Sequence, residues 1–125
     1  MSDSRDTPRQ AIARAYIDSL LSHDSSAVKF ASGARRVENG VTTGFSGPRL
    51  SKALNNAFYY RTILAIRNVE FSESGDTVHA RFLIDAGVRG KRLVTVGVEE
   101  NFLIPDGTIH FIRATLRLRS GRTRR

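Results

Sequence analysis

One carboxylate in the sequence stands where only apolar side chains are expected. Residues 93–104 read LVTVGVEENFLI, and alternate side chains of a strand point to opposite faces of a sheet. Glu100 therefore falls in the same row as Val96, Val98 and Phe102, which is otherwise apolar. A carboxylate removed from water costs several kcal/mol unless it is neutralised or hydrogen-bonded. Glu100 is accordingly either the acid of a pocket or an inward carboxylate that pairs with a buried arginine or caps a turn.

Few other side chains of the kinds that perform chemistry are present. The chain has no cysteine, which excludes disulfides and thiolate metal sites, and His23, His79 and His110 lack the spacing of metal ligands. His110 would begin a strand with inward parity and could line a cavity rim. Because metal, nucleotide and flavin motifs are all missing, the sequence predicts no cofactor and no metal site. Any chemistry would be cofactor-free proton transfer.

The net charge of +8 is concentrated at the C-terminus. Six arginines and no acid occur from Arg113 onward, which leaves 14 basic and 12 acidic residues in positions 1–112. Residues 120–125, SGRTRR, are predicted to form a basic disordered tail. Clustered arginines can neutralise phosphates, but no aromatic side chains are interleaved with them here. The sequence therefore does not favour a nucleic-acid partner.

The length of 125 residues suits one domain, expected over residues 8–119 after a flexible N-terminus at 1–7. No apolar stretch approaches the ~20 residues that a membrane helix needs. The start of the sequence lacks the basic and apolar segments of a signal peptide. We therefore expect a cytoplasmic protein without a membrane partner.

The first half of the chain carries helix signals. Thr7 is a good N-cap before Pro8, and Gln10 follows three residues after the cap, which predicts a helix that ends near Ser22. Asp24 could cap a second, short helix that ends near Gly33. A third helix is predicted over residues 46–57, and RRVENGV at 35–41 is expected to be extended with an Asn-Gly turn.

The second half changes to a period of two. Turn sequences that contain Gly75, Gly90 and Gly107 separate four segments of strand type. Three helices followed by an antiparallel four-stranded meander with one apolar face form an α+β design, in which the helices cover that face. The four segments are residues 62–71, 77–88, 91–104 and 108–119.

This order of elements resembles the nuclear-transport-factor-2-like superfamily, in its SnoaL-like and ketosteroid-isomerase-like branch. The resemblance covers residues 8–119, and it implies a cone-shaped, curved antiparallel sheet that wraps the N-terminal helix and leaves an apolar pocket at one end. The segments that carry it are AIARAYIDSLLSHDSSAVKFA, VENG, FSGPRLSKAL and VEENFLI-PDG-TIHFIRATL.

The resemblance also implies roles for particular residues. Ketosteroid isomerases combine a tyrosine on the first helix with a protonated carboxylic acid on a late strand, and a second carboxylate moves the proton. Tyr16 and Glu100 match the first two and would stabilise an enolate. The base falls at Asn39 in one register and at Glu38 when the match shifts by one residue, and both registers remain open.

The expected partner is a small apolar molecule held in this pocket. The resemblance implies a SnoaL-like or ketosteroid-isomerase-like isomerase or cyclase that acts on a polycyclic or carbonyl-bearing substrate. The alternatives are a non-catalytic hydrophobic-ligand-binding protein without a working base and a dimeric assembly module in which Glu100 is merely paired. The predicted lining of the pocket consists of Tyr16, Val96, Val98, Glu100, Phe102, Ile112, Ala114 and Leu116. The pocket would be closed from the side of the helices by Ile12, Leu54 and Phe58.

The opposite row of side chains suggests a surface contact between two copies. It mixes arginines with apolar residues, and such patches are typical of dimer contacts. In a two-fold contact Glu99 would meet an arginine of the partner, and the resemblance also points to a homodimer. The residues with this outward parity include Arg81, Leu83, Leu93, Leu103, Phe111, Arg113 and Arg117.

Overall fold

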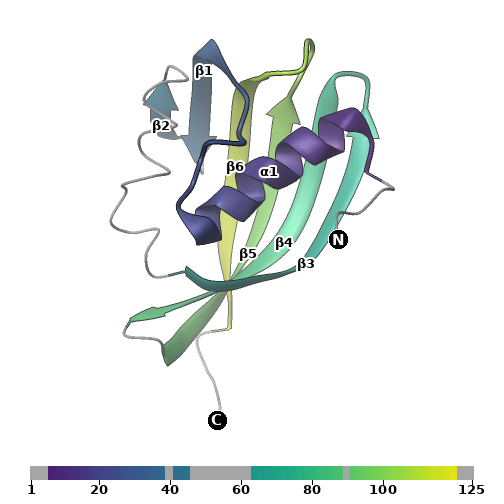
Figure 1. Cartoon of the computed structure of the whole chain (residues 1–125). Helices are drawn as coiled ribbons and strands as arrows, with labels where there is room; N and C mark the ends of the chain where they lie inside the picture. Colours follow the sequence, from purple (N-terminus) through teal and green to yellow (C-terminus); the bar gives the residue numbers. More distant parts are fainter. Residues whose placement is uncertain (1–5, 39–40, 46–62, 89–90, 121–125) are drawn as a thin grey trace.

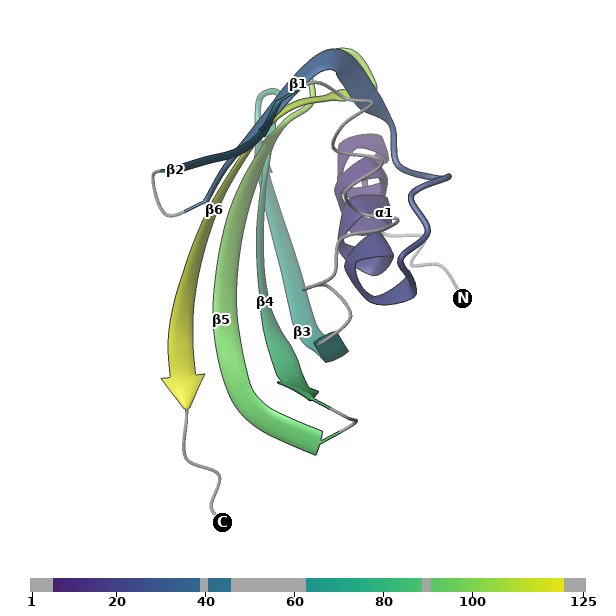
Figure 2. The same cartoon turned by 90° about the vertical axis from the view of Figure 1, so that its left-hand side faces the viewer.

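The computed structural model describes residues 6–38, 41–45, 63–88 and 91–120. In this part of the chain one helix, α1 (Pro8–Ser22), lies across the concave face of a curved six-stranded sheet. The sheet bends toward the helix along the whole length of its central strands (Figure 2). The predicted α+β class, with a curved sheet around the N-terminal helix, is confirmed.

The helix begins and ends at the residues that the sequence predicts. Thr7 accepts a hydrogen bond from the backbone N–H of Gln10 at 3.1 Å, and the Gln10 side chain accepts one from the N–H of Thr7 at 3.3 Å. This reciprocal pair satisfies two of the free amides at the start of the helix. At the other end His23 adopts a left-handed conformation with φ 62°, which stops the helix.

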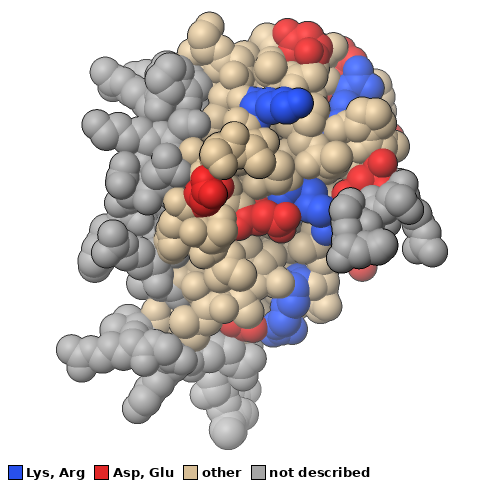
Figure 3. Space-filling view, viewed as in Figure 1, with Lys and Arg blue, Asp and Glu red and all other residues tan. Residues whose placement is uncertain are grey.

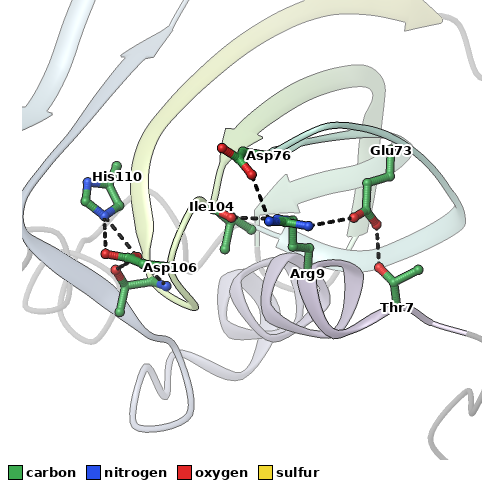
Figure 4. A network of polar contacts seen from close by, with 8 residues as sticks. Thr7, Arg9, Glu73, Asp76, Ile104, Asp106 and His110 are labelled. Atoms are coloured by element: carbon green, nitrogen blue, oxygen red, sulfur yellow. Dashed lines mark hydrogen bonds and ion pairs between the residues drawn. The ribbon is translucent and has the colours of Figure 1, made fainter.

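Arg9 fastens the first turn of α1 to the sheet (Figure 4). Its Nε donates to the carbonyl oxygen of Ile104 at 2.7 Å, and its Nη2 pairs with Asp76 at 2.8 Å. Nη1 lies 3.4 Å from Glu73, which also accepts a hydrogen bond from the Thr7 hydroxyl. Because these contacts connect the first turn of α1 to residues 73–76 and to Ile104, they fix the position of the helix over the sheet.

The strand order of the sheet is β2-β1-β6-β5-β4-β3. The last four strands pair with their sequence neighbours, so the predicted antiparallel meander is confirmed. β1 pairs with β6 in parallel, which makes the sheet mixed rather than wholly antiparallel as the sequence predicted. The strands are β1 (Phe30–Glu38), β2 (Val41–Phe45), β3 (Ile63–Ser74), β4 (Thr77–Val88), β5 (Lys91–Leu103) and β6 (Ile109–Ser120).

The predicted second helix, over residues 24–33, is wrong. Asp24 accepts a hydrogen bond from the N–H of Ser26 at 3.0 Å, in a turn that leads into β1 rather than into a helix. The chain joins the sheet where the N–H of Ile109 donates to the carbonyl of Lys29 at 2.7 Å. A short serine-rich segment has little helical propensity, and pairing with the free edge of β6 satisfies its backbone groups instead.

The third predicted helix, over residues 46–57, lies outside the described residues. Among the described residues, no helix combines the length and the hydropathy needed to cross a bilayer.

The core lies between α1 and the concave face of the sheet. Ala13, Tyr16, Ile17 and Leu20 form the buried side of the helix, each no more than 3% exposed. The Tyr16 ring meets the edge of Phe102 on β5, with 5.4 Å between ring centroids. Burial of each large side chain contributes roughly 1.5–3 kcal/mol to the stability of the fold.

Candidate functional site in the inner cavity

Glu100 lies on the inner face of β5, as the alternation of side chains predicts. Its cross-strand neighbours are Ala80 on β4 and Ala114 on β6, and the Glu100 residue is 1% exposed. Two alanines beside a glutamate leave room over the sheet, because neither methyl group reaches beyond the carboxylate. The small neighbours therefore make space for a third group to approach Glu100 from β1.

Arg36 of β1 supplies that group. Its Nη2 lies 3.6 Å from Glu100 Oε2, and its Nη1 donates to Glu38 Oε1 at 2.6 Å. Its Nε donates to the Tyr16 hydroxyl at 3.0 Å. The Arg36 side chain is only 7% exposed, so one buried guanidinium joins two carboxylates and the tyrosine of α1.

Ala114 explains why the two carboxylates come together. It is the register partner of Glu100 in the antiparallel pair β5–β6 and of Glu38 in the parallel pair β1–β6. One alanine of the central strand thus stands between two glutamates on the strands at either side. The Arg36 guanidinium bridges this gap on the same face of the sheet.

The surroundings of Glu100 favour its protonated form. The pKa of Glu100 is raised from 4.5 to about 7, chiefly because burial disfavours the charged carboxylate. The charge and hydrogen bonding of Arg36 oppose this rise, and the Glu38 charge adds to it. Oε2 is the oxygen next to Arg36, and the other oxygen, Oε1, is buried without a hydrogen-bond partner in the described part of the chain. A buried polar atom of this kind requires an explanation, and a bound ligand is one.

A cavity of about 150 Å³ adjoins these groups. Arg36, Glu38 and Glu100 border it, and the rest of its described wall is apolar. Leu20 of α1 closes one side. The apolar wall consists of Leu20, Ile63, Phe82, Ile84, Ala86, Val96, Val98 and Leu116. The arrangement suits a small ligand with polar atoms at one end only.

The structure places some of the predicted site residues at the cavity and others away from it. Glu38, Glu100, Val96, Val98 and Leu116 border the cavity. Tyr16 is buried and contacts the site through Arg36, whereas Phe102, Ile112 and Ala114 are buried in the core and do not border the cavity. Ile12 is half-buried at the edge of the core, and Asn39, Leu54 and Phe58 lie outside the described residues.

Arg36 is the residue of the candidate site that the sequence analysis did not identify. Arg36 and Glu38 are two residues apart on one strand, so their side chains share a face. An inward carboxylate on β5 needs a cationic partner, and the sequence offers two adjacent candidates, Arg35 and Arg36. Their side chains point to opposite faces of the sheet. Only the pairing of β1 with β6 shows that Arg36 is the one that points inward.

His110 takes part in a local contact instead of the cavity rim. Its Nε2 lies 3.0 Å from Asp106 Oδ1 in the turn before β6. His79, on the outer face, pairs through Nδ1 with Asn101 at 2.9 Å. Among the residues that the structure describes, no three side chains of metal-ligating type come together.

The outer face of the sheet carries a second hollow, of about 380 Å³, which lies over β3 to β6. Arg81 on its wall pairs with Glu70 at 3.2 Å, and Arg119 lies across Gly97, where a Cβ atom would be 3.0 Å from the arginine side chain. The hollow thus contains charges of both signs. On the side that bears α1, basic and acidic side chains are also interspersed (Figure 3).

Solved structures with this fold come from several bacteria. An LEH-like epoxide hydrolase of M. tuberculosis superposes with a TM-score of 0.73 at 16% identity, covering 90% of this chain and 84% of that chain. An NTF2-like protein of unknown function from Cytophaga hutchinsonii gives 0.71 at 15% identity, over 90% and 98% of the two chains. A ketosteroid isomerase-like protein from Kribbella flavida gives 0.68 at 11% identity, over 94% and 83%. The chain therefore has the nuclear-transport-factor-2-like fold.

Sequence comparison gives one family. Residues 2–116 match the family described as Domain of unknown function (DUF8021). Among curated proteins, none matches the sequence.

Proposed function

The chain belongs to the family described as Domain of unknown function (DUF8021), and because that description gives no reaction, we propose from the inner cavity that the protein is an isomerase-like enzyme. The proposed reaction is cofactor-free proton transfer on a small carbonyl compound. The observation that carries the proposal is the convergence of Glu38 and Glu100 on one apolar cavity, with Arg36 between them. Likeness to a ketosteroid isomerase-like protein supports the same class.

Glu100 is the proposed general acid. The proton of a neutral Glu100 resides on Oε1, because Oε2 is the oxygen that faces the Arg36 guanidinium. We propose that the neutral carboxyl group donates that proton to the carbonyl oxygen of a substrate in the cavity that Glu100 borders. A carboxylic acid with a pKa of about 7 is roughly half protonated at neutral pH, so it can both donate its proton and recover it during the reaction.

Glu38 is the proposed base. Its carboxylate removes a proton from the carbon beside the carbonyl while Glu100 protonates the oxygen, and the product of this step is an enol. For a β,γ-unsaturated ketone this enol is a dienol. Return of the Glu38 proton to its γ-carbon, with recovery of the oxygen proton by Glu100, then completes an isomerisation with all protons accounted for. Arg36 and Tyr16 act as positioning residues, since Arg36 holds both carboxylates and Tyr16 holds Arg36.

Acid-assisted addition of water to an epoxide is the second candidate. The same pair of residues could perform it, because Glu100 would protonate the ether oxygen while Glu38 activated a water molecule. The observation in its favour is the likeness to the LEH-like epoxide hydrolase, whose fold matches with a TM-score of 0.73.

Deuterium exchange tests the proposal. In D₂O the protein is expected to speed exchange of the α-protons of cyclohexanone, followed by NMR, and Glu38→Gln or Glu100→Gln should slow it at least ~100-fold, since each acid–base group contributes about 10²–10⁴. Glu99→Gln is the matched control, because Glu99 is the exposed neighbour on the same strand.

The result also separates the alternatives. If the folded protein binds cyclohexanone but does not speed exchange of its α-protons, the protein is a ligand-binding protein without this catalytic activity. Incorporation of ¹⁸O from labelled water into an epoxide probe, without α-proton exchange, would favour the second candidate.

We also propose a homodimer through the outer face of the sheet. Leu103 is 39% exposed there, and the outer hollow includes the unlike charges of Glu99 and Arg117. A two-fold contact would place acid against arginine in both directions. Light scattering at high micromolar concentration should give twice the chain mass of 13.9 kDa, and Leu103→Glu should halve it. A monomeric mass for the unaltered protein would refute this contact.

A further inference from the structure

We propose that the inner cavity selects electrically neutral molecules about the size of a single ring, with one hydrogen-bond-accepting oxygen. This inference rests on the proposed function, because it names the substrate class of the same site. It departs from the polycyclic substrates that the family resemblance implied. Three features of the cavity carry it, namely its volume, the distribution of its polar groups and the state of Arg36.

The volume limits the ligand. The cavity measures about 150 Å³, and an apolar cavity of roughly that size holds one benzene molecule. Typical pockets for drug-sized ligands occupy roughly 300–1,000 Å³. Val98 and Phe82 on its wall are each 3% exposed and belong to the packed core, so the wall cannot recede without loss of packing. A fused second ring would exceed the volume of this cavity.

The polar groups are concentrated at one end. Arg36, Glu38 and Glu100 meet there, whereas the wall formed by α1, β3, β4 and the remaining part of β5 is aliphatic or aromatic. A ligand with a second polar group would have to bury it against this wall without a partner, at a cost of several kcal/mol. One oxygen, directed at Glu100, satisfies the site.

The charge of the site disfavours anions. Arg36 already contacts Glu38, Glu100 and Tyr16, so its positive charge is balanced within the protein. A carboxylate in the cavity would lie close to the Glu38 carboxylate, and the described lining residues include no uncommitted cation. Like charges in a buried site repel strongly because the local dielectric constant is low.

Ligand-detected NMR tests the selection with three probes. Cyclohexanone is expected to bind, whereas cyclohexanecarboxylate, which adds the charge, and 2-decalone, which adds the second ring, should each bind at least ~10-fold more weakly. Equal or tighter binding of either one would overturn the proposal.

Cavity-filling variants locate the binding. Val98→Phe should weaken cyclohexanone binding at least ~10-fold by occupying the cavity, while Leu103→Phe adds the same ring on the exposed face of the same strand and should leave the affinity unchanged. If Val98→Phe does not fold, Ala86→Leu, at another point of the cavity wall, provides the same test. Unaltered binding in a folded filling variant would place the ligand elsewhere and overturn the proposal.

A failure of the proposed ligand selection can be distinguished from a failure of the proposed catalysis. Selective binding of cyclohexanone without deuterium exchange would leave the selection intact and refute the catalysis. Exchange of the α-protons of 2-decalone at the rate of cyclohexanone would support the catalysis and refute the selection.

Discussion

Replacement of Arg36 by methionine is expected to lower the free energy of unfolding by about 3–5 kcal/mol, because the substitution leaves a buried carboxylate without its cationic partner. Arg36 contacts Glu38 and Glu100, and its side chain is 7% exposed. Methionine fills similar volume, so the loss of charge dominates over the loss of packing. Since folded domains are stable by only ~5–15 kcal/mol, this is a large fraction of the total.

Urea unfolding at pH 7.5, followed by circular dichroism, measures the effect. Arg35→Met is the matched control: Arg35 precedes Arg36 on β1 but is exposed, and its replacement should change stability by less than about 0.5 kcal/mol. Arg36→Met combined with Glu100→Leu should be more stable than Arg36→Met alone, because the uncompensated acid is removed. A single Arg36→Met variant as stable as the Arg35→Met control would show that the buried ion pair has no role in stability.

Glu100→Gln is expected to make the protein less sensitive to pH. Burial raises the pKa of Glu100 from 4.5 to about 7. As the pH rises above 4.5, the unfolded chain releases this proton while the folded protein retains it until about pH 7. Stability from this group is therefore complete below pH 4.5 and is lost as the pH rises to about 7 and beyond. The loss is on the order of 3 kcal/mol, at 1.36 kcal/mol for each pH unit between the two values.

The measurement is the difference in unfolding free energy between the two proteins at pH 4.5, 6 and 8. Contributions from other acids cancel in this difference, so the unaltered protein should lose ~3 kcal/mol relative to Glu100→Gln over the range. Catalysed exchange should also decline above about pH 7, because the proposed acid is then ionised. A difference that does not change with pH would mean that folding does not raise the pKa of Glu100.

Local sequence features determined several parts of this protein. The cap formed by Thr7, Pro8 and Gln10 sets the start of α1, because these groups interact within one turn. Alternation of side chains, with turns at glycines, sets the meander of β3 to β6 and directs Glu100 inward. Each of these depends on residues that are close in the chain, so the sequence alone predicts them.

The tertiary structure decided the rest of the site. Segment 24–33 has weak local preferences, and it became turn and strand because the edge of β6 offered backbone partners some 75 residues later in the chain. That parallel pairing placed Glu38 opposite Ala114 and turned Arg36 toward Tyr16 and Glu100. No local pattern specifies the register between distant strands, and a shift of one residue would have directed Arg35 inward instead. The sequence alone therefore identifies Glu100 as an inward acid. Only the tertiary structure identifies Arg36 as its partner and brings Glu38 to the same cavity.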